Sequence, residues 1–500
     1  MGNKVIKNAS AYMLANLIGS IVNFLLLPVY TRFLTPADFG VLAMVTAFSS
    51  FLVPFMGLQL TESLRRSYFD HDDANVRALF STILYSIVVI NVGLLGLVHV
   101  GQRWIMAVAF ANVNVPYRPY ILLAMGIAFV QNVVNLCNLM LQVQQKGGTV
   151  LSVAGVRALI NAGAGLYFVV ALRMGAEGAL LGRLAAVTVT CAHLLWLLRR
   201  HVVATFRTQR LREGLHYSLP MIPHVLGGVV FMYSDKLILG YFLPLATVGL
   251  YEIANRIAMV MKQAVVAFDR AIAPVFMHKA TRSRDAAVEA FRPVIVKWMA
   301  AALFLFLCFS LFAEELLVIL APPEYRGAWV LVPVLTAAFV FRGLYQFTVK
   351  PILFDKKTAY IPAITGTAGM LNVVGNVLLI PLLGVHAAAW TTLLAFAWTF
   401  GMTLLVSKRC FSLSFDWRQI TRLVLLALLA LLVPMAVRSD TVWINLLLKV
   451  VSLGAFVVAV WVWDCGGITG DILHLLKGCR SAGRNRARDS LSPRKEGDSR

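Results

Sequence analysis

The chain has 500 residues, of which 59% are hydrophobic and only 14% are charged, and its mean hydropathy is +0.78. Soluble domains carry about 25% charged residues, so this composition excludes a soluble globular protein. The formal net charge of +22 would indicate nucleic-acid binding in a soluble protein. In a chain this apolar we interpret it as membrane topology and attraction to anionic lipid headgroups, and we expect no nucleic-acid partner.

Long apolar segments follow one another along the chain. A helix needs about 20 apolar residues to cross the hydrocarbon core, and it satisfies its own backbone hydrogen bonds there. We therefore expect an all-α polytopic membrane protein with about fourteen transmembrane helices. The predicted spans are residues 11–30, 39–59, 79–98, 120–141, 150–172, 178–198, 219–241, 248–268, 293–319, 329–349, 359–380, 385–406, 423–437 and 442–463.

The distribution of Lys and Arg between the loops predicts the orientation. With an even number of spans, one set of loops and both termini hold roughly 30 basic residues, and the other set holds roughly six. Basic residues in short loops stay on the cytoplasmic side. We therefore expect both the N-terminus and the C-terminus to be cytoplasmic.

The sequence contains an internal repeat. Residues 33–40 read FLTPADFG, and 209 residues later residues 242–249 read FLPLATVG, so four of these eight positions are identical. The same spacing pairs Thr149 with Thr358 and Gly175 with Gly384. Because six helices is an even number, the copies run in the same direction, which predicts two lobes in a parallel pseudo-twofold repeat with the substrate between them. The predicted domains are a six-helix lobe at 1–205, a second six-helix lobe at 206–410, helices 13–14 at 411–466, and a basic cytoplasmic tail at 467–500.

Several basic residues lie inside the predicted spans, where a charge is costly and normally faces protein or water. The deep ones, which we predict to line a cationic cavity, are Arg157, Arg183, Lys236, Arg256, Lys262 and Arg342. Few acids oppose them, chiefly Asp235 and Glu252, so such a cavity would attract an anion. Glu252 and Arg256 are four residues apart on one helix face, so a purely structural ion pair is an alternative for these two.

Four amide side chains share one face of the fourth predicted span. Gln131, Asn135, Asn138 and Gln142 follow the spacing i, i+4, i+7, i+11, which covers about 16 Å of helix. A file of amides suits a ligand rich in hydroxyl groups. Hydrogen bonding between helices is the alternative, because amides in membrane helices often do this.

Two stretches resemble a known family. Residues 217–220 (YSLP), 234–242 (SDKLILGYF), 248–251 (VGLY) and 254–256 (ANR) closely resemble the seventh and eighth helices of Wzx-like polysaccharide flippases. These flippases are a branch of the multidrug/oligosaccharidyl-lipid/polysaccharide superfamily. Residues 32–40 (RFLTPADFG) are similar to the first turn of the same family. Where that family has Asp-Arg in the seventh helix, this chain has Asp235-Lys236, which keeps the charge and loses bidentate phosphate binding.

The resemblance implies a flippase of the bacterial inner membrane. It would move an undecaprenyl-pyrophosphate-linked oligosaccharide, such as an O-antigen or exopolysaccharide repeat unit, from the cytoplasmic to the outer leaflet by alternating access. The six cations would hold the diphosphate or an acidic sugar, the four amides would contact sugar hydroxyls, and Asp235 or Glu252 would couple transport to H⁺ or Na⁺. A polysaccharide polymerase and chain-length proteins are the implied protein partners.

We expect neither a cofactor nor a metal site. The six cysteines form no CxxC pair, and no GxxxxGK[ST] loop for ATP is present. One alternative is a multidrug antiporter of the same superfamily, which should have acids rather than cations in its cavity. The other is a membrane-embedded polysaccharide-assembly enzyme, which would need a catalytic acid set or a large hydrophilic loop.

Overall fold

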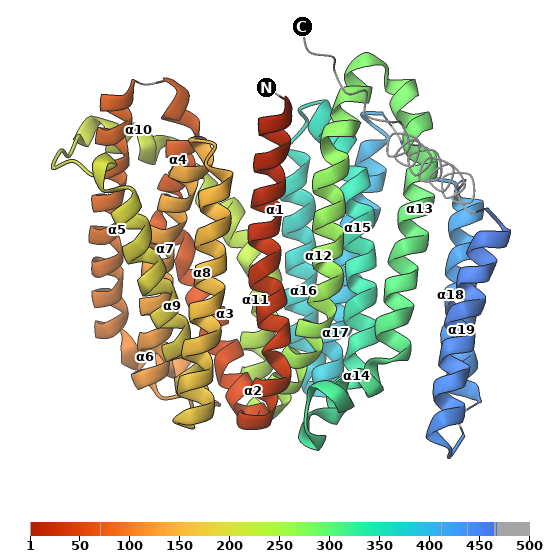
Figure 1. Cartoon of the computed structure of the whole chain (residues 1–500). Coiled ribbons are helices and arrows are strands. Elements are labelled where there is room, and N and C mark those ends of the chain that lie inside the picture. The colour runs from red at the N-terminus through yellow and green to blue at the C-terminus, as the bar shows by residue number, and fades with distance from the viewer. Residues whose placement is uncertain (1, 71, 412, 438, 465–466, 468–500) are drawn as a thin grey trace, which may run out of the picture. The chain divides into compact units, whose positions relative to one another are not determined.

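The structure, a computed structural model, describes all residues except 1, 71, 412, 438, 465–466 and 468–500. For residues 2–7, 9 and 16 it describes the backbone and not the side chain. The described residues form helices and no strand (Figure 1). The main helices are α1 (Gly2–Leu25), α2 (Leu27–Phe33), α3 (Pro36–Gly57), α4 (Leu60–Ser67), α5 (Asp73–Val100), α6 (Gln102–Ala109), α7 (Leu122–Val143), α8 (Gly147–Leu166), α9 (Gly175–Leu197), α10 (Thr208–Ser218), α11 (Ile222–Phe242), α12 (Leu245–Arg282), α13 (Arg284–Leu311), α14 (Ala313–Leu320), α15 (Leu331–Phe354), α16 (Tyr360–Leu383), α17 (Val385–Ser407), α18 (Trp417–Ala436) and α19 (Val442–Val462).

In the described part of the chain, thirteen helical segments are long and apolar enough to cross a membrane. This confirms the polytopic all-α fold, with one span fewer than the sequence predicts. The difference is α12, whose 38 residues include Glu252, Arg256, Lys262 and Asp269. These charges lower its hydropathy below that of a lipid-facing helix, although its length is ample for a bilayer.

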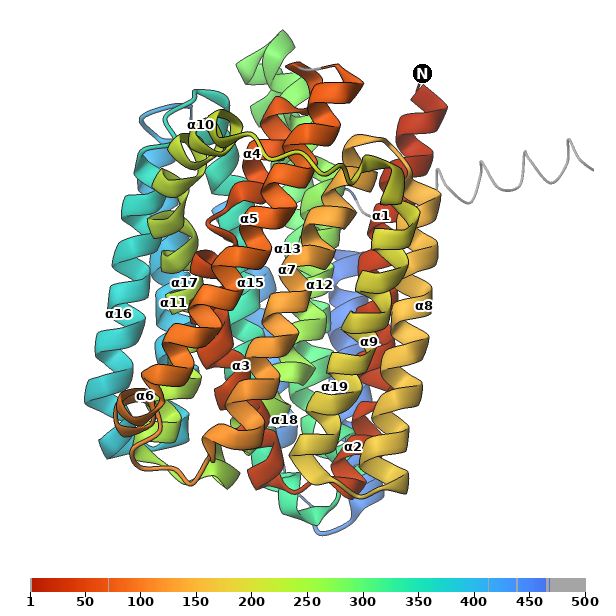
Figure 2. The same cartoon turned by 90° about the vertical axis from the view of Figure 1, so that its left-hand side faces the viewer.

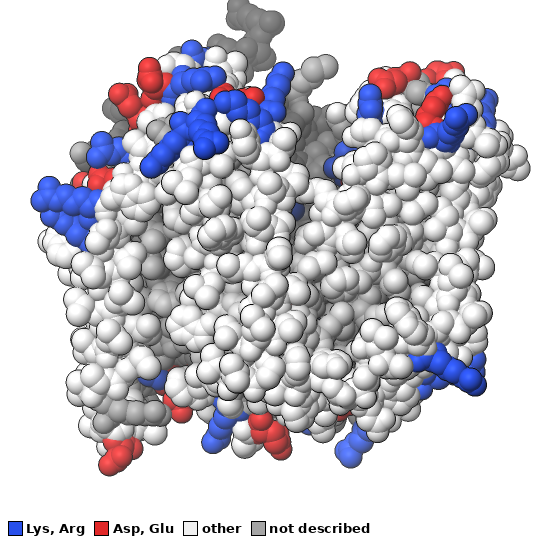
Figure 3. Space-filling view, turned by 180° about the vertical axis from the view of Figure 1, so that it is seen from behind, with Lys and Arg blue, Asp and Glu red and all other residues white. Residues whose placement is uncertain are grey.

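On the face that Figure 3 shows, Lys, Arg, Asp and Glu gather at the two ends, and the band between them is almost entirely uncharged. Large apolar side chains are exposed elsewhere in the described chain as well; Leu382 and Trp443 are each 77% exposed. In water such surface would be costly, whereas lipid tails solvate it without penalty. The predicted basic tail at 467–500 lies outside the described residues, apart from Gly467.

The chain folds into two compact units, and each is assembled from separate stretches of the sequence. The first contains Met1–Phe268, Ala313–Tyr345 and Lys357–Thr403, and the second contains Asp269–Phe312, Gln346–Lys356 and the described residues from Leu404 on. The predicted lobe boundaries at 205 and 410 follow the repeat rather than these units, and they stay a prediction.

Within the first unit, α8 packs between α1 and α9, and α9 packs on α7 (Figure 1). Helix α3 lies against both α7 and α11, and α11 also contacts α16 (Figure 2). Within the second unit, α13 packs on α18 and α19. An ion pair between Arg292 and Asp416, 2.9 Å long, connects α13 to the residue that caps the N-terminus of α18.

The helix boundaries repeat with the spacing that the sequence predicts. Helix α3 begins at Pro36 and α12 begins 209 residues later at Leu245, and α7 and α15 begin at Leu122 and Leu331 with the same spacing. Gly175 and Gly384, another such pair, both adopt positive φ, +59° and +63°, which only glycine adopts without strain. The repeat is therefore visible in the backbone as well as in the residues.

The two copies of the repeated motif touch each other through their glycines. A Cβ atom on Gly40 would lie 2.0 Å from the carbonyl oxygen of Leu245, and one on Gly249 would lie 1.8 Å from that of Pro36. Gly40 and Gly249 are equivalent in the repeat, and so are Pro36 and Leu245. The contact is thus reciprocal, as expected of two elements that meet at a pseudo-twofold axis. The absence of a side chain permits this close backbone approach.

A methyl group added at Gly40 tests this contact. We expect Gly40→Ala to lower the free energy of unfolding of the detergent-solubilised protein by about 1–3 kcal/mol, because the clashing atom is backbone and cannot rotate away. Gly228→Ala in α11 is the matched control, since nothing lies within 4 Å of a Cβ there. Alanine favours the helix at that position, so the control should be as stable as the original protein or more so. Equal stability of both variants in thermal unfolding would contradict the reciprocal contact.

Candidate substrate cavity

The first unit encloses a cavity of about 980 Å³. Its lining comes from α1, α2, α3, α4, α7, α8, α9 and the first half of α12. It reaches Glu62 and Arg65 on α4. Its lining also includes Tyr30 on α2 and Phe39 on α3, the residue before Gly40 of the Gly40–Leu245 contact. This volume falls at the upper end of the range for small-molecule sites.

The amide face of α7 borders this cavity. Gln131, Asn135, Asn138 and Gln142 are all lining residues, as is the buried Asn132. The side-chain nitrogen of Gln131 donates to the side-chain oxygen of Asn135 at 2.7 Å. The helical spacing thus places the four predicted amides on the side of α7 that faces the cavity.

Three of the six predicted cations also line the cavity, namely Arg157 on α8, Arg183 on α9 and Arg256 on α12. Arg157 donates from Nη2 to the side-chain oxygen of Gln131, so it is hydrogen-bonded to the amide face. Arg256 forms an ion pair with Glu252 at 2.9 Å. Within the residues that the structure describes, neither Arg157 nor Arg183 has an acidic partner.

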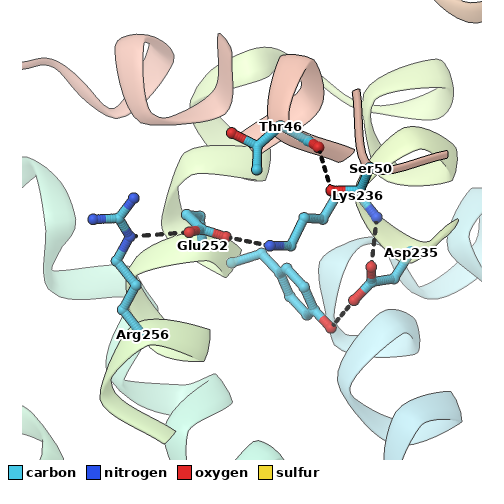
Figure 4. Close-up of polar contacts among 7 residues, drawn as sticks. Thr46, Ser50, Asp235, Lys236, Glu252 and Arg256 are labelled. Carbon is cyan, nitrogen blue, oxygen red and sulfur yellow. Dashed lines mark hydrogen bonds and ion pairs between the residues drawn. The ribbon is translucent and has the colours of Figure 1, made fainter. Parts of the chain in front are cut away.

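A buried charge cluster connects α11 to α12 beside the cavity (Figure 4). Lys236 Nζ lies 2.7 Å from one oxygen of Glu252, whose other oxygen binds Arg256. Lys236 is 5% exposed and Glu252 is 8% exposed. Asp235 accepts a hydrogen bond of 2.6 Å from the Tyr251 hydroxyl and one of 2.8 Å from the backbone N–H of Lys236. The two acids that the sequence predicts for ion coupling are therefore both bonded to Lys236, Asp235 through its backbone N–H and Glu252 through its side chain.

The other predicted cations lie apart from the cavity lining. Lys236 points at Glu252 and is not a lining residue. Lys262 and Arg342 are half-buried and are not lining residues either. The Arg342 guanidinium lies over the Phe396 ring, 5.5 Å from its centre. The structure therefore brings together three of the six cations, all four amides and Glu252.

Some lining residues were missed by sequence reasoning. Arg65, one of the basic residues in the loops predicted to be cytoplasmic, forms a 3.4 Å ion pair with Glu62 on the cavity lining. Asn161 lies four residues after Arg157 and donates to the side-chain oxygen of Asn23 at 3.2 Å. The i, i+4 spacing from Arg157 is a signal that predicts Asn161 on the same face. Asn23 follows Asn16 and Ser20 at the spacing i, i+4, i+7, which is the signal that predicts a polar face on this span.

Aromatic residues Tyr30 and Phe39 belong to the cavity lining. Phe39 is fully buried and meets Tyr325 edge to face, with ring centres 5.8 Å apart. The Tyr325 hydroxyl donates to the backbone oxygen of Leu34 at 2.6 Å. Asn112 donates to the backbone oxygen of Tyr241 at 2.8 Å. These contacts join elements of the two repeats.

The fold matches solved structures of membrane transporters. One is "Lipid II flippase MurJ, inward closed conformation", with a TM-score of 0.74, 12% identity, and coverage of 91% of this chain and 99% of that chain. Another is an inward-facing multidrug resistance MATE family transporter of the MOP superfamily, with a TM-score of 0.64, 14% identity, and coverage of 79% and 93%. A third is the Vibrio cholerae MATE transporter VcmN in the bent form, with a TM-score of 0.54, 13% identity, and coverage of 82% and 96%. At these identities the likeness shows the fold alone, a polytopic helical membrane fold that this chain shares with those proteins.

The sequence itself shows the family. Residues 5–279, more than half of the chain, match the family described as "Polysaccharide biosynthesis protein". A search of curated proteins finds no match. The chain belongs to the polysaccharide biosynthesis protein family, which confirms the resemblance drawn from the motifs.

Proposed function

We propose that the chain is a flippase for an undecaprenyl-pyrophosphate-linked oligosaccharide, the repeat unit of a surface polysaccharide. The observation that carries this proposal is the cavity, whose lining combines a file of amides with two arginines that have no acidic partner among the described residues. A diphosphate favours guanidinium groups, and sugar hydroxyls favour amides. The polyprenyl tail is apolar and can stay in the lipid while the polar head passes through the protein.

The mechanism that we propose is alternating access. The cavity lining includes Arg65 on α4, in the segment between the predicted spans 39–59 and 79–98. With the N-terminus predicted to be cytoplasmic, this segment after the second span is cytoplasmic too, so the head group would be taken up from the cytoplasmic leaflet of the bacterial inner membrane. Release on the other side requires separation of the contacts around Gly40 and Gly249. Asp235 and Glu252 are the acids proposed to couple this movement to H⁺ or Na⁺, and both termini are proposed to be cytoplasmic. A polysaccharide polymerase and chain-length proteins would act on the released product.

The residues favour this substrate over an organic cation. An exporter of organic cations needs an available carboxylate in its cavity. The two glutamates of the lining, Glu62 and Glu252, are both held in ion pairs with arginines. Among the described lining residues, Arg157 and Arg183 are the charged groups that form no ion pair.

Deletion of the gene tests the function in cells. We expect the deletion strain to lose its surface polysaccharide and to accumulate the lipid-linked oligosaccharide. Without the flippase, the lipid-linked oligosaccharide would stay on the cytoplasmic leaflet. The measurements are immunoblotting or gel analysis of the polysaccharide and mass spectrometry of extracted polyprenyl diphosphate lipids. The original gene supplied on a plasmid is the control. Normal polysaccharide together with a changed sensitivity to drugs would support the multidrug antiporter instead. Loss of the polysaccharide without accumulation of any complete lipid-linked unit would point to an assembly enzyme.

A further inference from the structure

The cations in and beside the cavity differ in whether an acid neutralises them. Glu252 is shared between Lys236, at 2.7 Å, and Arg256, at 2.9 Å. Both of its oxygens are therefore engaged by cations, and the group lies where little water reaches it. Such charge-assisted bonds are strong in a region of low dielectric, so an incoming anion would have to compete with Glu252 for Arg256.

Arg157 and Arg183 have no such competitor among the residues that the structure describes. They stand on neighbouring helices, since α8 packs on α9, and both line the cavity. Two like charges that face the same cavity from adjacent helices repel one another. Two neighbouring guanidinium groups of this kind are an unfavourable arrangement that a doubly charged anion would relieve.

The amide face begins at this pair. Arg157 donates to Gln131, and Gln131 donates to Asn135. The remaining amides follow along α7 toward its C-terminal end. A ligand whose anionic group sits on the arginines would thus have the amide file of α7 running away from that group.

We propose that Arg157 and Arg183 form the diphosphate subsite of the cavity, and that Glu252 is a positioning residue that withholds Arg256 and Lys236 from the diphosphate. The sugar chain then extends from this subsite along Asn135, Asn138 and Gln142. This proposal rests on the proposed function, and it divides the cations into two that bind the ligand and two that maintain the structure around it.

The test is binding of geranylgeranyl diphosphate, a polyprenyl diphosphate without sugar, to the purified full-length protein in detergent at fixed ionic strength. We expect Arg157→Gln and Arg183→Gln each to weaken the affinity about tenfold or more, because each removes a charge-assisted bond. Arg256→Gln should weaken the affinity less than about threefold, because Arg256 is already paired with Glu252 and contributes little to the ligand. Glu252→Gln should strengthen it, because it releases two cations. Arg103→Gln, an exposed arginine of α6 outside the cavity lining, is the matched control and should leave the affinity unchanged.

Glu252→Gln could unfold the protein by leaving Lys236 buried without its partner, so the double variant Lys236→Met/Glu252→Gln is measured beside it. That variant removes both charges of the buried pair and still frees Arg256, and it too should bind the diphosphate at least as tightly as the original protein. Geranylgeranyl monophosphate should bind more weakly than the diphosphate to the original protein and lose less in the Arg157 and Arg183 variants.

The outcomes separate the two proposals. If the original protein binds the diphosphate but Arg256→Gln loses as much affinity as Arg157→Gln, or if both Glu252 variants bind more weakly, the subsite assignment is wrong and the flippase proposal stands. If the original protein binds neither lipid while its fold is intact by gel filtration and thermal unfolding, the proposed function fails and this inference fails with it.

Discussion

The double substitution Arg157→Gln/Arg183→Gln should reduce transport of the lipid-linked oligosaccharide by about a hundredfold or more. Hydrogen bonds to charged groups contribute about 1.5–3 kcal/mol each, and every 1.4 kcal/mol corresponds to a factor of about ten in affinity. Both residues line the cavity, and neither forms an ion pair with an acid among the described residues. The measurement is the amount of surface polysaccharide in a deletion strain that carries the variant gene, with the lipid-linked intermediate quantified in the same cells.

Conservative replacements distinguish loss of charge from loss of packing. Arg157→Lys and Arg183→Lys keep the charge and lose the planar fork, so each should retain part of the activity. Arg103→Gln carries the same change at an exposed site and should restore normal polysaccharide. If the double glutamine variant is present in the membrane at the normal level and restores polysaccharide as well as Arg103→Gln does, the cationic cavity does not bind the substrate.

The second large effect concerns stability. Lys236→Met should lower the free energy of unfolding by about 3–5 kcal/mol, because it leaves the carboxylates of Asp235 and Glu252 buried with one cation fewer. Lys236→Met/Glu252→Gln should recover most of that loss, since replacing both members of a buried ion pair with neutral groups is often close to neutral in stability. The difference between the single and the double variant measures the coupling across α11 and α12.

Denaturant or thermal unfolding of the detergent-solubilised variants supplies the numbers for this cycle. Lys262→Met is the matched control, because Lys262 is only half-buried and lies outside the ion pairs of the described residues. Its expected change is below about 1 kcal/mol. A double variant that is as unstable as Lys236→Met alone would show that Lys236 stabilises the protein through its packing, and the ion pair with Glu252 would then have no special role.

The close contact of the repeats connects these two predictions. Arg256 and Glu252 stand on α12, whose first turn meets the first turn of α3 through Gly249 and Gly40. Movement of the repeats at this contact would carry Arg256 relative to Arg157 and Arg183, which stand on helices of the first repeat. Alternating access would therefore change the electrostatic environment of the proposed diphosphate subsite as well as its exposure.

The membrane fold and the repeat could be predicted from the sequence because both depend on local patterns. Apolar segments long enough for a bilayer have few other uses in a protein, and the motif at 33–40 returns at 242–249 with four identical residues. Helix α12 is the informative exception. Two of the charges that lower its hydropathy, Glu252 and Arg256, face the cavity, so the span that hydropathy supports least carries part of the candidate site.

The amide face was also predictable, since Gln131, Asn135, Asn138 and Gln142 share a helix face whatever the rest of the molecule does. The pair of Glu252 and Arg256 follows from the same rule, and the structure forms it. Periodicity along one helix therefore determined which side chains stand together on one element.

Only the tertiary structure decided which cations face the cavity. Lys236 and Arg256 look alike in the sequence, as two basic residues beside an acid in neighbouring spans, but Lys236 is turned into the protein toward Glu252, whereas Arg256 also borders the cavity. Which of the two cations borders the cavity depends on how α11 is rotated against α12 and α3. That rotation is set by packing between residues far apart in the chain. The sequence by itself determined the helices, their repeat and the faces that carry polar groups. Only the folded chain shows how those faces meet, because ion pairing depends on distance in space. It is the structure that leaves Arg157 and Arg183 without acidic partners among the described residues.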